Sequence, residues 1–206
     1  MRLKIAPDSL LERAAITMRM LPEPLGFTTM GIGYSRSLVA AVRLGIFEAL
    51  IDEQMTAEKL AAATHCSPAG IRALANALAG IGALHRRKGK YSNSKMAKRW
   101  LLKGREGSVH DFILFMGWCE ELMADLEDSV RSGSPKRFHD REMPQEFWES
   151  YMRALGGFAK MTFPEINAKV KFRKDIANLL DVGGGHGLCV GSRRCSRGIR
   201  PRSRRW

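Results

Sequence analysis

A cluster of glycines between residues 183 and 187 is the stretch whose residue types and spacing best suit ligand binding. The chain there reads NLLDVGGGHG, in which a short apolar run leads through an acidic residue into the glycines. Such a run is too short for a helix and is typical of a buried parallel strand. Glycine lets the backbone turn sharply and approach a ligand without a Cβ in the way. The pattern predicts a cofactor loop, with a ligand-free turn as the alternative, and its candidate binding residues are Asp181, Gly183, Gly184, Gly185 and Gly187.

The residues that should complete such a site do not follow the glycines. A helix with an apolar stripe is expected next, because its first N–H groups would face the ligand. A ribose-binding carboxylate is expected about twenty residues past the first glycine. Instead, residues 191–206 contain seven arginines, and no acidic residue occurs after Asp181. We expect this Arg-rich tail to be disordered.

Upstream of the glycines, helix start signals and a hairpin occur in the order of a winged helix-turn-helix. Residues 34–50 are predicted to be helical, because their apolar residues Val39, Val42, Ile46 and Leu50 recur at helical spacing. N-cap residues at Thr56 and Ser67 then start two shorter helices, the second with Pro68 in its first turn. Gly89 lies between two polar arms, as in a short hairpin. We therefore expect a winged-helix domain over residues 10–100.

Two functions remain open for this winged-helix domain. Its hairpin carries Arg86, Arg87, Lys88 and Lys90, which could hold DNA phosphates. The same fold also serves as a dimerisation or substrate-covering module. The net charge of +13 favours nucleic acid at first sight, but seven of the positive charges lie in the tail. The hairpin alone does not decide between the two.

Residues 101–172 are predicted to be a helical linker and cap region. One helix is expected from about residue 110 until the Ser-Gly-Ser-Pro stretch after residue 131. A later helix places Phe147, Tyr151 and Leu155 on one side, and Gly156 with Gly157 is expected to loosen it. Such an aromatic stripe favours a core position over direct cofactor contact.

Composition and cysteine usage exclude several other classes of protein. The chain has 206 residues, of which 45% are hydrophobic and 27% charged, as in globular proteins. Its four cysteines show no metal-ligand spacing, so we expect no metal site, and their scattered use suits a reducing cytosol. Neither a signal peptide nor a long apolar run is present, so we expect a cytoplasmic chain without a membrane span.

Five segments taken together resemble the plant-type and bacterial small-molecule O-methyltransferases that use S-adenosylmethionine. They read AVRLGIFEAL, GIRALANALAGIGALHRRKGKYSNS, WCEELMADLEDSVRSGSPKRF, FWESYMRAL and LLDVGGGHG, and they occur in the order of that family. The resemblance covers the chain up to about residue 188. It implies a mainly α chain: a winged-helix dimerisation domain and linker helices, then the first strand and glycine loop of a Rossmann-like α/β domain. It also implies a homodimer formed through the N-terminal domain.

The resemblance implies a cofactor and a reaction, but few site residues. The glycines at 183, 184, 185 and 187 would bind S-adenosylmethionine, Asp181 would shape their loop, and Tyr151 and Leu155 would touch the cofactor. In the family, a His deprotonates a hydroxyl of a small aromatic or polyketide-like acceptor, which then attacks the sulfonium methyl. None of the five histidines here matches that His, so we assign no catalytic residue.

The departure from the family begins just after Leu188. We expect residues 173–190 to start the cofactor domain, and we hypothesise that a shifted reading frame then replaces the rest with the tail at residues 191–206. On this view the chain is truncated and inactive alone. The alternatives are a winged-helix DNA-binding regulator, a non-catalytic dimerisation protein, and a tail that serves as a genuine basic arm for nucleic acid.

Overall fold

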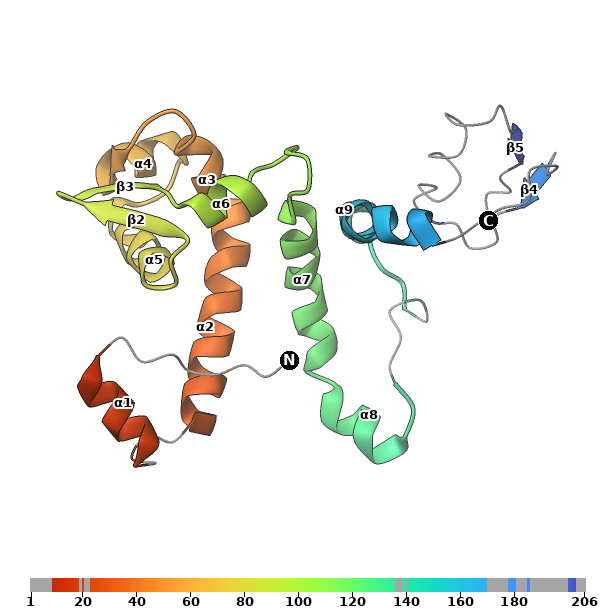
Figure 1. The fold of residues 1–206 in the computed structure, drawn as a ribbon, viewed down its shortest axis with the longest axis horizontal. Coiled ribbons are helices and arrows are strands. Elements are labelled where there is room, and N and C mark those ends of the chain that lie inside the picture. The colour runs from red at the N-terminus through yellow and green to blue at the C-terminus, as the bar shows by residue number, and fades with distance from the viewer. Residues whose placement is uncertain are drawn as a thin grey trace.

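The fold is mainly helical, with a winged-helix domain followed by long helices and a separate pair of short strands. It is known from a computed structural model, which describes residues 9–18, 20, 23–135, 139, 141–169, 178–180, 185 and 200–202. Helices α1 (Leu10–Thr17) and α2 (Glu23–Arg43) come first. Figure 1 shows α2 running alongside α7, with the winged-helix elements gathered around one end of α2.

The winged-helix core forms where the sequence places its caps and apolar residues. After α2 come α3 (Ile46–Ala49), α4 (Ala57–Ala63) and α5 (Pro68–Gly80). The hydroxyl of Thr56 accepts from the Lys59 N–H at the start of α4, as predicted, and that of Ser67 accepts from the Gly70 N–H at the start of α5. The fully buried apolar side chains of this core come from all four helices and include Ala41, Ile46, Phe47, Leu60, Ile71 and Leu78.

A small antiparallel sheet forms the wing. Strands β1 (Met55–Thr56), β2 (Leu84–Arg87) and β3 (Lys90–Asn93) lie in the order β1-β3-β2. Lys88 and Gly89 at the hairpin tip have φ angles of 49° and 75°, which confirms the predicted turn at Gly89. Tyr91 on β3 is buried, and its hydroxyl donates to Asn76 Oδ1 on α5 at 2.8 Å. The wing is thereby fixed to the helices behind it.

Helix α6 (Lys95–Trp100) leads from the wing to α7 (His110–Met123), α8 (Leu126–Ser132) and α9 (Gln145–Lys169). The single helix expected over the α7–α8 region is wrong, because the chain turns at residues 124–125. Asp125 lies at this turn, where its carboxylate forms an ion pair with Arg141 from the segment before α9. Helix α9 remains helical through Gly156 and Gly157, the two residues that are expected to loosen it.

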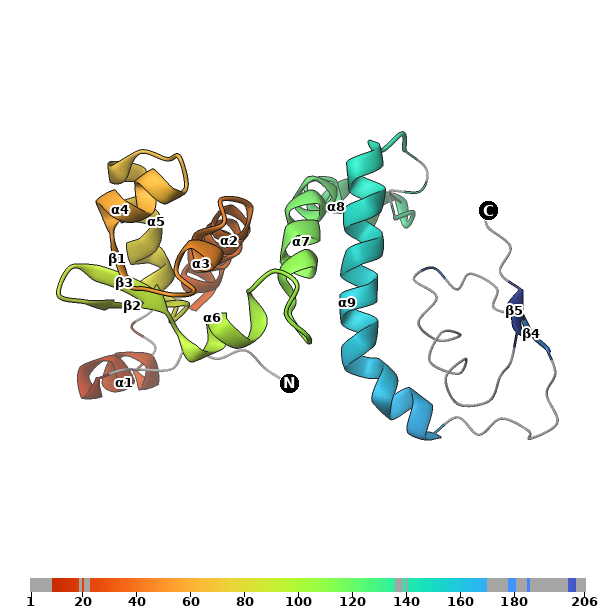
Figure 2. The ribbon, with the colours of Figure 1, turned by 90° about the horizontal axis from the view of Figure 1, so that it is seen from above.

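An aromatic cluster joins α7 to α9, which lie side by side in both views (Figures 1 and 2). Phe147 on α9 is completely buried and packs against Phe115 and Trp118 of α7, with ring centroids 5.6 and 5.8 Å away. The opposite face of α7 contributes Ile113 and Leu114 to the winged-helix core. Helix α7 therefore connects two hydrophobic cores.

The last described elements are two short parallel strands. Strand β4 (Asn178–Leu180) pairs with β5 (Arg200–Arg202), Leu179 opposite Pro201. The structure thus gives Arg200, Pro201 and Arg202 a strand partner where the sequence predicts a disordered tail. The physical reason is that backbone pairing in a parallel ladder does not depend on side-chain polarity. The rest of residues 191–206 lies outside the described residues. The domain boundaries proposed from the sequence stay predictions.

None of the helices in the described part of the chain combines the length and apolar character needed to cross a membrane.

Candidate functional site

Of the predicted glycine loop, the structure describes only one residue, Gly185. Gly185 is exposed and has a φ of 48°, in the left-handed region where a residue with a Cβ is strained. It follows β4 closely in the chain, so the expected order of strand and left-handed glycine is present. The other four candidates of this loop, Asp181, Gly183, Gly184 and Gly187, lie outside the described residues.

The two predicted cofactor contacts upstream of the loop lie on α9. Tyr151 belongs to the aromatic cluster, and its ring centroid is 5.3 Å from that of Phe115 and 6.3 Å from that of Phe147. Leu155, one turn later, is 36% exposed. The apolar stripe of α9 is therefore buried in the core at Phe147 and exposed to solvent at Leu155. Contact of Tyr151 or Leu155 with a cofactor stays a prediction.

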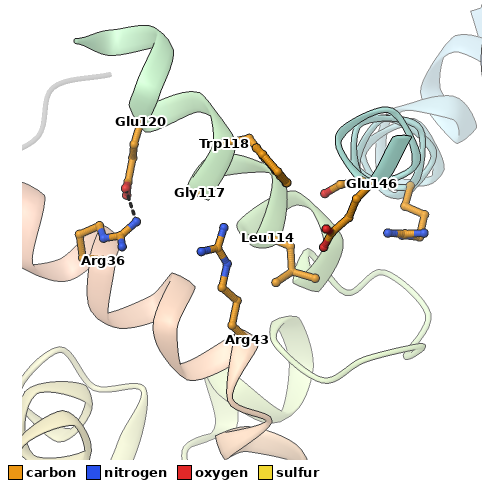
Figure 3. Close-up of a pocket in the computed structure, with 9 residues that line it drawn as sticks. Arg36, Arg43, Leu114, Gly117, Trp118, Glu120 and Glu146 are labelled. Atoms are coloured by element: carbon orange, nitrogen blue, oxygen red, sulfur yellow. Dashed lines mark hydrogen bonds and ion pairs between the residues drawn. The ribbon is translucent and has the colours of Figure 1, made fainter. Parts of the chain in front are cut away.

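A cavity of about 570 Å³ lies between α2, α7 and α9. This volume is within the usual range for small-molecule sites. Figure 3 shows side chains from all three helices around it. Two of them, Arg36 on α2 and Glu120 on α7, form an ion pair with 2.5 Å between Nη1 and Oε2. The indole of Trp118 supplies an aromatic surface in the same lining.

Arg43 is an exposed arginine of this lining. It is the last residue of α2, and its side chain makes no hydrogen bond or ion pair with any residue in the described ranges. By contrast, Arg153 on α9 lies 3.5 Å from Glu149 and 4.0 Å from Asp111. Arg43 and Glu146, which are both exposed, thus bring charges of opposite sign to the same lining.

Gly117 and Ser150 shape the same cavity from α7 and α9. A Cβ at Gly117 would lie 2.7 Å from Arg43 Nη2 and 2.9 Å from Val39 Cγ1, so only glycine leaves room for the guanidinium. Ser150 is 5% exposed, and its hydroxyl has no hydrogen-bond partner among the described residues. One signal in the sequence indicates this arrangement, because a glycine inside an apolar helix often marks a close approach of another segment.

Two other titratable side chains of α7 suggest no further chemistry. Burial raises the pKa of the Cys119 thiol above its ordinary value, so this cysteine is a poor nucleophile. His110 is 6% exposed and lies 3.4 Å from its neighbour Asp111. Within the described part of the chain, no group of three or more potential metal ligands occurs.

The helix with which a winged-helix domain would contact DNA has no unpaired basic residue here. Helix α5 occupies the position of a recognition helix, and Arg72 is its one basic residue. Arg72 is held in an ion pair with Glu58 on α4. The arginines of the hairpin are exposed, as solvated charges are in most proteins. The fold thus places no free cation on α5 to contact phosphates.

Comparison with known proteins points to one class. Residues 28–103 match the O-methyltransferase dimerisation domain. The chain is 28% identical over 174 residues to the 3-hydroxy-5-methyl-1-naphthoate 3-O-methyltransferase of Streptomyces sahachiroi, covering 78% of this chain and 48% of the relative. It is 34% identical over 161 residues to mouse acetylserotonin O-methyltransferase, covering 75% of this chain and 37% of the relative. These matches confirm the resemblance: residues 28–103 form an O-methyltransferase dimerisation domain, and the chain as a whole is similar to O-methyltransferases.

Solved structures show the same fold. Human N-acetylserotonin methyltransferase in complex with SAM superposes with a TM-score of 0.72 at 20% identity, over 96% of this chain and 60% of that one. The chain spans less than half the length of the two curated relatives. What the chain shares with its relatives is therefore the winged-helix domain, the helices that follow it and the beginning of the cofactor domain.

Proposed function

We propose that the chain takes part in methyl transfer from S-adenosylmethionine to a hydroxyl group of a small aromatic or polyketide-like acceptor, as a homodimer in the cytosol. The observation that carries the proposal is the continuity of three parts in one chain. An O-methyltransferase dimerisation domain leads into helices that enclose a cavity, and these lead into a strand followed by a left-handed glycine. The acceptor class agrees with the naphthoate for which the Streptomyces relative is named.

Among the described residues, one feature suits a bound cofactor. The left-handed Gly185 after β4 offers a turn that a side chain would obstruct, as a closely approaching ligand requires. Gly183, Gly184, Gly185 and Gly187 would form the cradle, with Asp181 at its edge and Tyr151 and Leu155 facing it from α9. When bound, S-adenosylmethionine supplies an electrophilic methyl group.

The chain's own contribution is to bind and orient the acceptor. In the cavity, Trp118 and Leu114 would contact the ring of the acceptor, which would fix its hydroxyl relative to the methyl donor. We assign no catalytic base, since none of the five histidines matches the family's catalytic His. This 206-residue chain also contains no acidic residue after Asp181 to hold a ribose. We therefore expect weak cofactor binding and little or no turnover by this chain alone.

Titration of the chain with S-adenosylmethionine, followed by calorimetry or NMR, tests the proposal. We expect a dissociation constant of about 1 mM or weaker, equivalent to about −4 kcal/mol. Gly185→Val should abolish this binding, because a β-branched residue does not tolerate a positive φ. The matched control is Gly89→Val, which replaces a left-handed glycine at the hairpin tip.

Each outcome of the titration has a definite meaning. Equal loss of binding in both variants would contradict a cofactor loop at Gly185. In that case a dimer without cofactor would point to a non-catalytic dimerisation protein. A micromolar dissociation constant would contradict the expected weakness of the site.

A further inference from the structure

Strand β5 lies where a nucleotide-binding α/β domain has the second strand of its sheet. It pairs with β4 in parallel, and the two strands lie side by side in both views (Figures 1 and 2). In such domains the strand that leads into the glycines lies beside the next strand along the chain, and ligands bind beyond the carboxyl ends of the strands. Gly185, with its left-handed φ of 48°, follows β4 at that end. This edge of the sheet is therefore where a nucleotide would bind.

The register of the two strands places Arg202 at the same edge. Arg202 is the last residue of β5, and it lies opposite Leu180, the last residue of β4. It also lies about twenty residues past Gly183, the first glycine, which is the spacing at which a ribose-binding residue is expected. The strand pairing and the spacing along the chain thus select the same residue.

The residue type at this position decides which ribose the site accepts. A carboxylate there accepts hydrogen bonds from free ribose hydroxyls, such as those of S-adenosylmethionine. Arginine has five N–H donors and no acceptor, so it suits a phosphate on the ribose instead. No acidic residue occurs after Asp181, so the tail offers no carboxylate that could take the ribose-binding role. S-adenosylmethionine, whose sulfonium is cationic and whose ribose carries no phosphate, therefore fits Arg202 poorly.

We propose that the edge formed by β4, Gly185 and β5 binds a nucleotide with a phosphate on a ribose hydroxyl, and that Arg202 pairs with this phosphate. The inference goes beyond the proposed function, because it uses the same glycine loop but requires no methyl transfer. It also gives a physical reason for the weak binding of S-adenosylmethionine expected above. An arginine stands where the ribose of that cofactor needs a carboxylate.

The test compares 2′-AMP with adenosine, which differ only in the phosphate on the ribose, by NMR titration of the full chain. We expect 2′-AMP to bind about tenfold more tightly than adenosine, because a hydrogen bond to a charged group contributes at least this much. Arg202→Gln should remove this preference and leave adenosine binding unchanged, which also shows that the glycine loop is intact. The matched control is Arg200→Gln, which should keep the preference. Arg200 lies on the same strand but opposite Asn178, at the end away from Gly185.

The converse variant, Arg202→Asp, places a carboxylate at the ribose position. It should lose the preference for 2′-AMP and bind S-adenosylmethionine about fivefold more tightly than the unaltered chain does. Because damage to the fold cannot raise the affinity for a ligand, this variant keeps the test decisive if Arg202→Gln is unstable. Arg200→Asp is its matched control and should leave the affinity for S-adenosylmethionine unchanged.

The proposal is overturned if 2′-AMP and adenosine bind equally, if neither binds, or if Arg200→Gln reduces the preference as much as Arg202→Gln. It is also overturned if Arg202→Asp binds S-adenosylmethionine no better than the unaltered chain. These results are separate from those of the glycine variants. A preference for 2′-AMP that depends on Arg202, with equal losses of cofactor binding in Gly185→Val and Gly89→Val, would keep the phosphate site and remove the proposed function. Cofactor binding that depends on Gly185, without a preference for 2′-AMP, would do the reverse.

Discussion

Asn93, at the end of β3, connects the wing to the helices through hydrogen bonds inside the core. It is 4% exposed, and its Nδ2 donates to the carbonyls of Phe47 at 2.7 Å and Leu50 at 3.1 Å. These carbonyls lie at the end of α3, where helical carbonyls lack partners within the helix. One side chain thus satisfies two buried acceptors that come from a distant part of the sequence.

Replacing Asn93 by Ala should destabilise the winged-helix domain by about 1–3 kcal/mol, because it leaves buried carbonyls without a donor. Urea unfolding followed by circular dichroism measures the change in the free energy of unfolding. Ser92→Ala at the neighbouring position is the matched control, since Ser92 makes no hydrogen bond through its hydroxyl within the described part of the chain. A loss below about 0.5 kcal/mol in Asn93→Ala would show that water replaces the amide.

At the scale of the element, the start of α4 combines a cap with an acidic residue. Thr56 caps the helix, and Glu58 in its first turn forms an ion pair with Arg72 of α5. The pKa of the Glu58 carboxyl is lowered, mainly by a backbone hydrogen bond, then by the Thr56 hydroxyl, and least by Arg72. The ionised carboxylate therefore stabilises the start of this helix.

Glu58→Gln should lower the thermal midpoint at neutral pH, and the difference from the unaltered chain should shrink in acid. A carboxyl with a depressed pKa contributes stability above the pKa of the unfolded chain, and it loses this contribution as the pH falls through the folded value. The stability difference should therefore shrink at pH values below 4.5, the ordinary pKa of this carboxyl. Melting curves between pH 3 and 7 measure it, with Glu53→Gln in the exposed loop before β1 as control. A difference that does not vary with pH would rule out this origin.

The sequence predicted those elements whose signals are local. Thr56, Ser67 and Gly89 each act on their own turn, so they could be read without knowing the fold. The break before α8 could not, because Asp125 is held by Arg141 from beyond the helix. The cavity was missed for a similar reason: the room for Arg43 is made by a glycine on another helix. The pairing of β5 with β4 likewise depends on residues far apart in the chain.

At the scale of the whole molecule, the first two helices carry an apolar surface that the rest of the described chain leaves uncovered. Leu11 on α1 is 84% exposed, and Ile32 on α2 is 71% exposed. The other large hydrophobic side chains that are exposed in this region are Leu10, Met18, Met20, Leu25, Phe27, Met30 and Tyr34. Contiguous exposed apolar surface of this kind marks an interaction site. The match to a dimerisation domain from residue 28 onward makes a second copy of the chain its expected partner.

Ile32→Glu should therefore convert the expected dimer into monomers, because it places a charge in a desolvated interface. Size-exclusion chromatography with light scattering measures the mass over a range of protein concentrations. The matched control is Val130→Glu on α8, which changes a side chain of similar exposure, 74%, outside α1 and α2. The control should remain dimeric and Ile32→Glu should be monomeric with an unaltered circular dichroism spectrum. If the unaltered chain is itself a monomer, or if both variants dissociate alike, the apolar surface of α1 and α2 does not form the dimer interface.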